Sequence, residues 1–144
     1  MEIDDDEANN DDAADNNVEI SLLAFTGINM GNVMQLAVFI GGSTLHAMVD
    51  MGSTHCFFIT AVAQRLGLCP TLCPGLSVGV ANGERLPSSG VCRVVPVRIG
   101  KEMFDIDIYI MDLGGYEMVL GCYWLCTLVE TETMITIMKQ AEDT

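Results

Sequence analysis

Apolar and polar residues alternate along much of the chain, which is typical of half-buried β-strands. The period of two is clear over residues 33–40, whose apolar members share one face: Met34, Leu36, Val38 and Ile40. Gly41-Gly42 follows, and two glycines readily adopt the positive φ angles of a tight hairpin turn. A second alternating run over residues 44–49 ends at Asp50. The pattern therefore predicts a hairpin that brings one acidic side chain to a strand end.

Helical spacing follows this hairpin. Four apolar residues recur at intervals of three and four, namely Ile59, Val62, Ala63 and Leu66, and Gly67 comes directly after them. Glycine is the usual residue just beyond the end of a helix. We therefore predict a short helix that ends at Gly67.

Two more hairpins are expected downstream. Residues 76–81 lead into Asn82-Gly83, which is the strongest short signal for a two-residue turn. Residues 91–99 and 104–110 surround Gly100-Lys101, and the second run alternates between apolar residues and a wet face of Asp105, Asp107 and Tyr109. Both stretches predict antiparallel pairs of strands.

The last part of the chain predicts three shorter elements. These are a strand over residues 116–120 that stops at Gly121, a helical turn over residues 123–125, and a final strand over residues 133–138. Short strands with Gly-rich turns favour a mostly β fold, either a closed barrel or a sandwich, with one or two short helices. A chain of 144 residues is enough for one such domain.

Charge is concentrated at the N-terminus. The net charge is −14, nine acidic residues precede residue 20, and the first basic residue is Arg65. We expect a disordered acidic linker over 1–18, a folded domain over 19–138 and a disordered tail over 139–144. The sequence shows no basic patch and no apolar run of about 18 residues, so we expect neither direct nucleic-acid binding nor a membrane span.

The six cysteines are relevant to the cellular compartment of the protein and to metal binding. The acidic N-terminus lacks the basic and apolar regions of a secretory signal, so we expect an intracellular, reducing, cytoplasmic location. Two pairs could be imagined as zinc ligands, Cys69 with Cys73 and Cys122 with Cys126. Their spacing has three intervening residues where metal sites commonly have two, so we favour buried free thiols and expect no metal and no cofactor.

Asp50 is the residue that needs an explanation, because a buried ionised carboxylate is costly unless it is paired or used. The Asp-x-Gly pattern alone is weak, since Asp112-Leu113-Gly114 matches it equally well. The context of Asp50 differs. A strand leads into it, Ser53-Thr54 and a helix follow, and a second apolar-apolar-Gly element, Val119-Leu120-Gly121, comes about 70 residues later.

Longer stretches carry a family resemblance. They are ISLLAFTGI, MQLAVFIGGSTLHAMVDMGSTHCFF, RLGL, PGLSVGVANGERL, GVCRVVPVRIG and YEMVLGCYWL, which span roughly residues 19–129. Together they resemble the retropepsin-like aspartic protease domain of gypsy-class LTR retrotransposon (gag-pol) polyproteins. The continuous match is far more specific than the Asp-x-Gly pattern. It implies a closed retropepsin-like (acid protease) β-barrel as a single lobe.

The resemblance implies an aspartic endopeptidase that works as a homodimer on a polypeptide substrate. Peptide hydrolysis of this kind needs two carboxylates around one water, so each of two copies would supply its Asp50. Two carboxylates about 3 Å apart share a proton and titrate as one unit. Gly52 would let its backbone approach the carboxylate and donate to it, and Ser53 would bond the outer carboxylate oxygen.

The resemblance also implies supporting parts. A flap built from Val80, Ala81, Asn82 and Gly83 would exclude water and hold the peptide in a groove. Met51 and Thr54 would support the active site from within the loop. Val119, Leu120 and Gly121 would support it by packing beneath the loop.

Three departures from the family favour an alternative function. Met51 stands where the family has a Thr or Ser whose hydroxyl bonds across the dimer, and methionine cannot donate that bond. The C-terminal segment VETETMITIMKQAEDT replaces an apolar, Trp-containing stretch. Ile59 stands at the expected helix cap, which leaves Thr60 as a displaced cap. The alternative is a catalytically impaired remnant that acts only as a folded interaction or structural domain.

Overall fold

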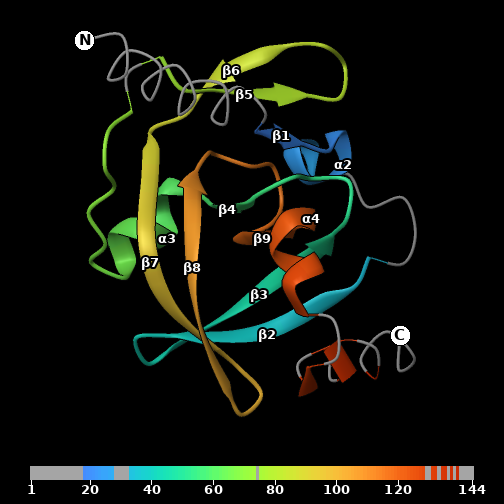
Figure 1. The fold of residues 1–144 in the computed structure, drawn as a ribbon. Helices are drawn as coiled ribbons and strands as arrows, with labels where there is room; N and C mark the ends of the chain where they lie inside the picture. Colours follow the sequence, from blue (N-terminus) through green and yellow to red (C-terminus); the bar gives the residue numbers. More distant parts are fainter. Residues whose placement is uncertain are drawn as a thin grey trace, which may run out of the picture.

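Six strands close into a barrel in this computed structural model, which describes residues 18–27, 33–73, 75–128, 131–132, 134–135, 137 and 139 (Figure 1). Neighbouring strands follow the order β2-β3-β9-β4-β8-β7. Their bounds are β2 Gln35–Ile40, β3 Ser43–Asp50, β4 Cys56–Phe58, β7 Gly90–Ile99, β8 Glu102–Ile110 and β9 Met118–Gly121. The predicted mostly β, closed retropepsin-like barrel is confirmed.

A smaller sheet lies at one end of the barrel, with the order β1-β5-β6 (Figure 1). Its strands are β1 Glu19–Ile20, β5 Ser77–Val80 and β6 Arg85–Pro87. Strands β5 and β6 form the expected antiparallel hairpin, whereas β1 runs parallel to β5 along its other edge. The N-terminal strand is therefore an additional strand of the hairpin sheet, which the alternation of residues did not predict.

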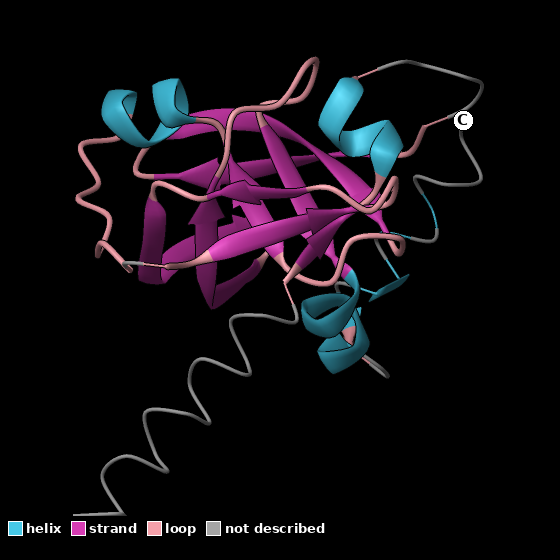
Figure 2. Cartoon of the chain, turned by 90° about the horizontal axis from the view of Figure 1, so that it is seen from above, coloured by secondary structure: helices cyan, strands magenta, loops and turns pink. Residues whose placement is uncertain are grey.

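The helices are short and lie at the periphery of the strands (Figure 2). Those with defined bounds are α2 Leu22–Thr26, α3 Thr60–Arg65, α4 Cys122–Leu125 and the 3-10 helix η1 Cys126–Leu128. The helix expected before Gly67 and the helical turn at 123–125 are confirmed as α3 and α4. The final strand expected over 133–138 is wrong, because residues 134, 135 and 137 are helical; residues 133, 136 and 138 lie outside the described part.

Two apolar clusters form the core. The same strands contribute to both, because residues on one face enter the first cluster and residues on the other face enter the second. Inside the barrel, Phe58, Met118 and Leu120 belong to the first cluster. Phe57 and Val119 point the other way, into a second cluster beneath the small sheet. Successive residues of a strand point to opposite faces, so strands buried on both faces separate the two clusters.

The second cluster explains one error in the expected pattern. Tyr109 was placed with Asp105 and Asp107 on a wet face of its strand, but Tyr109 is only 6% exposed and belongs to the second cluster. The two aspartates are exposed, as expected. The small sheet covers this end of β8, and sequence alternation cannot show where on a strand such a cover begins.

The hairpin turns follow their glycines closely. Gly41 and Gly42 have φ angles of 56° and 85° between Ile40 and Ser43, which form the last pair of the β2–β3 ladder. The β5–β6 turn is one residue longer than expected. Its loop is Ala81 to Gly83, because the Val80 amide donates to the Glu84 carbonyl at 2.8 Å and Gly83 takes the left-handed position with φ 96°.

The expected boundaries of the folded domain shift slightly at both ends. Val18 was assigned to the acidic linker, but its side chain is fully buried and its carbonyl accepts from the Gly79 amide at 3.0 Å. The folded part therefore includes Val18. Residues 1–17 and 140–144 lie outside the described residues, so the linker and the rest of the tail stay predictions. Lys139 was assigned to the disordered tail, but it is helical. Within the described ranges, no helix has the length and apolarity to cross a membrane.

Candidate active site

Asp50 is the last residue of β3, and a neighbouring strand fixes its position. Asp50 pairs with Gly121 of β9 in a parallel register. The chain beyond each strand continues the contact, because the amides of Cys122 and Tyr123 donate to the carbonyls of Ser53 and Thr54 at 2.6 and 3.0 Å. The loop after Asp50 is therefore bonded at several points to the segment that follows β9.

Gly121 is needed where these segments meet, since a Cβ at this position would overlap the backbone of His55. Val119 and Leu120 are fully buried on opposite faces of β9. All three residues therefore lie in tightly packed surroundings.

Three donors inside or near the loop hold the Asp50 carboxylate. The Gly52 amide donates to Oδ1 at 3.0 Å, and the Ser53 hydroxyl donates to Oδ2 at 2.6 Å. Ser53 is fully buried, while Asp50 is half-buried. A charge-assisted bond between a hydroxyl and a carboxylate is short and strong, so these contacts favour one orientation of the carboxylate.

The third donor is Ser21, which lies 29 residues upstream. Its hydroxyl donates to Asp50 Oδ2 at 2.6 Å, and its amide donates to Ser53 Oγ at 3.0 Å. Sequence reasoning missed this residue. The available signal was a serine before an apolar run, which marks a helix N-cap, and Ser21 does cap α2 by accepting from the Ala24 amide at 3.1 Å. That signal does not reveal the contact with Asp50.

The structure separates the expected flap from the Asp50 loop by one strand. Val80 is 5% exposed, whereas Ala81, Asn82 and Gly83 are exposed at the tip of the hairpin. Strand β1 joins the two parts. It pairs with β5 on one edge, and on the other edge the Glu19 amide donates to Thr54 Oγ1 at 2.8 Å.

The Met51 side chain projects from the surface of the loop, with 60% of its area exposed. Ser53 beside it is buried and Thr54 is half-buried. An exposed apolar side chain next to a bonded carboxylate gives the loop two distinct surfaces, one polar and fixed, the other apolar and open.

A family model described as aspartyl protease matches residues 36–124, which is more than half of the chain. The chain belongs to this aspartyl protease family. The match begins in β2, ends in α4 and includes the complete Asp50 loop.

Solved structures place this aspartyl protease domain among retropepsin-like folds. EIAV protease complexed with the inhibitor HBY-793 superposes with a TM-score of 0.55 and 18% identity, covering 71% of this chain and 93% of that one. A retropepsin-like aspartic protease from Rickettsia conorii gives a TM-score of 0.51 at 24% identity, covering 71% and 74%. The retroviral protease-like domain of Ddi1 from Leishmania major gives 0.53 at 15%, covering 67% and 78%. At these identities the likeness concerns the fold.

One curated relative is a viral polyprotein. The retropepsin-like domain is 31% identical over 77 residues to the "Enzymatic polyprotein" of Carnation etched ring virus. The match covers 54% of this chain and 12% of the polyprotein, so the chain spans about an eighth of that relative's length.

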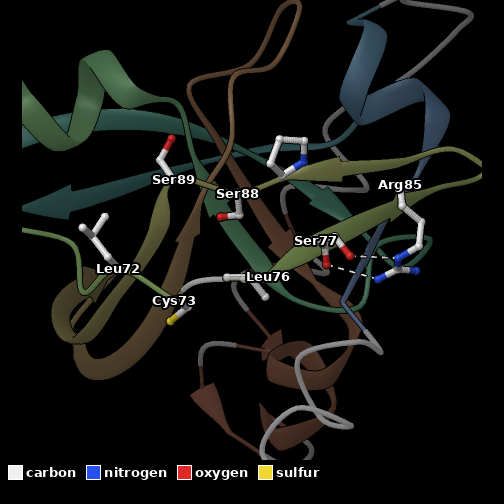
Figure 3. Close-up of a pocket in the computed structure, with 9 residues that line it drawn as sticks. Leu72, Cys73, Leu76, Ser77, Arg85, Ser88 and Ser89 are labelled. Carbon is white, nitrogen blue, oxygen red and sulfur yellow. Dashed lines mark hydrogen bonds between the residues drawn. The ribbon is translucent and has the colours of Figure 1, made fainter.

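A surface pocket lies away from Asp50, at the foot of the β5–β6 hairpin (Figure 3). It has a volume of about 540 Å³, and Leu72, Cys73 and Leu76 form an apolar part of its wall. Arg85 donates from Nε to Ser77 Oγ at 2.9 Å and from Nη2 to the Ser77 carbonyl at 3.1 Å, which ties β6 to β5. The residues that line this pocket include none of the Asp50 loop.

The cysteines of the domain are free, and their burial differs from expectation. Cys69 and Cys126 are exposed, and Cys73 and Cys122 are half-buried, so the expectation of buried thiols is wrong for both Cys-x-x-x-Cys pairs. The buried thiols are those of two other cysteines, Cys56 and Cys92; burial raises the pKa of Cys56 to about 12, partly offset by a hydrogen bond with the Gly121 backbone. Among the described residues, no group of three or more His, Cys, Asp or Glu is placed to hold a metal.

Proposed function

We propose that this retropepsin-like domain is an aspartic endopeptidase that cleaves the polyprotein of a gypsy-class LTR retrotransposon. The observation that carries the proposal is the Asp50 carboxylate, held at a barrel strand end by the Gly52 amide and the Ser53 hydroxyl. Such bonds fix the orientation of a group that must meet both water and substrate. Membership of the aspartyl protease family supports the same chemistry.

In the proposed mechanism, the Asp50 of two copies face each other across a two-fold axis. One carboxylate takes a proton from a water molecule as that water attacks the peptide carbonyl carbon. The other, protonated, carboxyl group hydrogen-bonds the carbonyl oxygen and stabilises the tetrahedral intermediate. Transfer of a proton to the amide nitrogen then lets the carbon–nitrogen bond break. Ser53 and Gly52 act as positioning residues in each copy.

Two exposed side chains support a homodimer. Met51 lies in the Asp50 loop itself, and Tyr123 lies on α4, whose first amides bond the Ser53 and Thr54 carbonyls. Their exposed fractions are 60% and 57%. Apolar and aromatic side chains are enriched at interfaces, and here they flank the loop that a second copy would have to approach.

Two further observations support the polyprotein context and the location. A viral polyprotein contains a segment similar to this chain, which supports a polyprotein context. Exposed free thiols at Cys69 and Cys126 suit a reducing compartment, because disulfide exchange would consume them elsewhere. We therefore propose that the domain works in the cytoplasm.

Met51 favours a second candidate function, that of a protease-derived remnant which folds but does not cleave. A methionine at this position cannot donate a hydrogen bond to the other copy, and its side chain must be packed twice across the axis. Displacement of catalytic groups by about 1 Å can cost about a hundredfold in rate.

A cleavage assay on three proteins separates the two candidates. The wild type, Met51→Ser and the control Asp50→Ala are incubated with apolar peptide substrates, with and without pepstatin. The pH is about 4 to 6, the range in which a shared-proton carboxylate pair operates. Pepstatin-sensitive cleavage by the wild type supports the enzyme. Cleavage by Met51→Ser alone supports the remnant, and cleavage that survives Asp50→Ala contradicts both.

A further inference from the structure

We propose that residues 18–21 occupy the peptide groove of their own domain and thereby inhibit it in cis. This inference rests on the proposed function, because it takes the space between the hairpin β5–β6 and the Asp50 loop to be the substrate groove. Contacts on both edges of β1 fill this space.

On one edge, β1 extends the hairpin sheet. Glu19 pairs with Gly79 and Ile20 with Val80, and the Gly79 amide donates to the Val18 carbonyl at 3.0 Å. Addition of an extended segment to an exposed strand is a general way to bind a peptide, because the main-chain hydrogen bonds do not depend on sequence. In this chain the added strand is the chain's own N-terminal segment (Figure 1).

On the other edge, β1 is bonded to the Asp50 loop. The Thr54 amide donates to the Glu19 carbonyl at 2.9 Å, and the Glu19 amide donates to Thr54 Oγ1 at 2.8 Å. Both backbone groups of Glu19 are therefore engaged by the loop. A substrate strand in the same space would need these Thr54 groups, so it could bind only after β1 had left.

The side chains of residues 18–21 also hold this segment in place. Val18 and Ile20 are 0% and 1% exposed and belong to the second apolar cluster, whereas Glu19 between them is exposed. Apolar side chains at alternate positions of this segment therefore pack against the wall of the proposed groove. This pattern predicts that the groove accepts extended peptides with apolar residues two apart.

Ser21 places the end of the occupant on the carboxylate itself. Its hydroxyl and that of Ser53 both donate to Asp50 Oδ2 at 2.6 Å, and the Gly52 amide donates to Oδ1. A carboxylate offers about four acceptor positions, so three of them are already filled. A water that needs Asp50 as a proton acceptor must compete with the Ser21 hydroxyl.

Residues 18–21 would inhibit effectively because they belong to the same chain as the groove. A tethered segment competes at an effective concentration on the order of millimolar, which exceeds the concentration of most free peptides. Displacement of the segment, or a cut that releases it, would open the groove. The same contacts would make the segment a reversible inhibitor when it is supplied as a separate peptide.

The test uses the full chain with a specific protease site introduced between Gly27 and Val33, where a cut frees the segment after the barrel has folded. Pepstatin binding and apolar peptide cleavage are measured before the cut and after removal of the released segment. We expect the cut protein to bind pepstatin at least about tenfold more tightly. Equal affinity before and after the cut, or loss of the β-sheet circular dichroism signal on release, would overturn the inference.

Synthetic peptides supply the matched comparison. A labelled peptide of residues 16–27 should rebind the cut protein and displace pepstatin. Ser21→Ala in that peptide should weaken rebinding more than Leu22→Ala, since Leu22 is 45% exposed and the Ser21 hydroxyl contacts Asp50. Equal effects of the two changes would contradict the placement of Ser21 on the carboxylate.

The outcomes separate this inference from the proposed function. Peptide binding that appears only after the cut, without any cleavage, supports the inference and contradicts the protease function. Cleavage with the same KM before and after the cut supports the protease function and contradicts the inference. Absence of peptide binding and cleavage in both states contradicts both.

Discussion

Two Asp-x-Gly stretches lie in the described chain, and their surroundings differ. Asp50 ends a barrel strand, is half-buried, and accepts from Gly52, Ser53 and Ser21. Asp112 follows β8 in an exposed loop, and its Oδ1 accepts from the Thr60 amide at 3.1 Å. Asp112 therefore supplies the first turn of α3 with an acceptor from outside the helix.

This role for Asp112 corrects the expected cap of α3. The cap position is Ile59, which makes no side-chain bond, and Thr60 is the first helical residue. Thr60 is therefore not a displaced cap. The orphan amide at the helix start is satisfied by a carboxylate 52 residues away, which is one of the ways in which helix ends are completed.

The two glycines show the same contrast. A Cβ at Gly52 would lie 3.2 Å from Asp50 Oδ1 and from the Ser21 Cβ, both side-chain atoms. A Cβ at Gly114 would overlap the Thr26 carbonyl, which is backbone. One glycine lets the chain approach a carboxylate, and the other lets two loops pack. A three-residue pattern of this kind therefore forms a site only together with the strand and the donors around it.

Neutralising each aspartate in turn should have the largest effect. Asp50→Asn should abolish peptide cleavage, with a loss of about a hundredfold or more, because the asparagine amide cannot take a proton from water. Asp112→Asn should leave the cleavage rate within about twofold of the wild type. The measurement is kcat/KM on an apolar peptide, and equal losses in the two variants would contradict the assignment.

Exchange of the middle residue of each Asp-x-Gly stretch should have the next largest effect. Met51→Thr supplies the hydroxyl that the loop lacks, so we expect tighter dimerisation and cleavage faster by up to about a hundredfold. Leu113→Thr places the same residue in the other stretch, where Leu113 packs against the second apolar cluster, and should lower stability without raising activity. Sedimentation and kcat/KM measure the two effects. No gain in Met51→Thr would show that the methionine is accommodated.

Much of the barrel was predictable, because its strands carry the signals that set local structure. Alternation over 33–40 and 44–49 and the two turn glycines predict the first hairpin, which the structure forms as β2 and β3. Strand β1 was not predictable in this way, since two residues have no period and β1 exists only through its contacts with β5 and Thr54. In such short elements, tertiary contacts outweigh the intrinsic strand propensity of the residues.

The predicted site residues are brought together to different degrees. Asp50, Gly52 and Ser53 form one bonded unit, which the order of residues in one loop makes foreseeable. Ser21 could not be foreseen, because a contact between residues 29 apart depends on how the second cluster packs. The exposure of Met51 is similarly a property of the folded loop.

Substitution of the two glycines should separate stability from activity. Gly114→Ala should lower the free energy of unfolding by about 1 to 3 kcal/mol, since the new methyl group meets the Thr26 backbone. Gly52→Ala should cost less stability, because the atoms it meets belong to side chains, but it should slow cleavage by shifting the Asp50 carboxylate. Urea unfolding and kcat/KM on both variants check this. The reverse order would show that the Asp50 loop, rather than the Gly114 loop, limits stability.

Removal of the Asp112 carboxylate should have the smallest effect. Asp112→Ala leaves the Thr60 amide without its acceptor, which should cost about 1 kcal/mol of stability and leave peptide cleavage unchanged. Asp112→Asn retains a side-chain carbonyl and should restore most of that loss. Urea unfolding of the two variants decides this, and an Asn variant as unstable as the Ala variant would contradict the capping role.

The parallel pairing of β3 with β9 has a consequence for synthesis on the ribosome. Asp50 and its glycine are made about 70 residues before Gly121, the partner that aligns them. A nascent or truncated chain that stops before β9 contains the acidic motif without the strand that gives it a geometry. The order of translation therefore delays assembly of the site until nearly the whole domain has emerged.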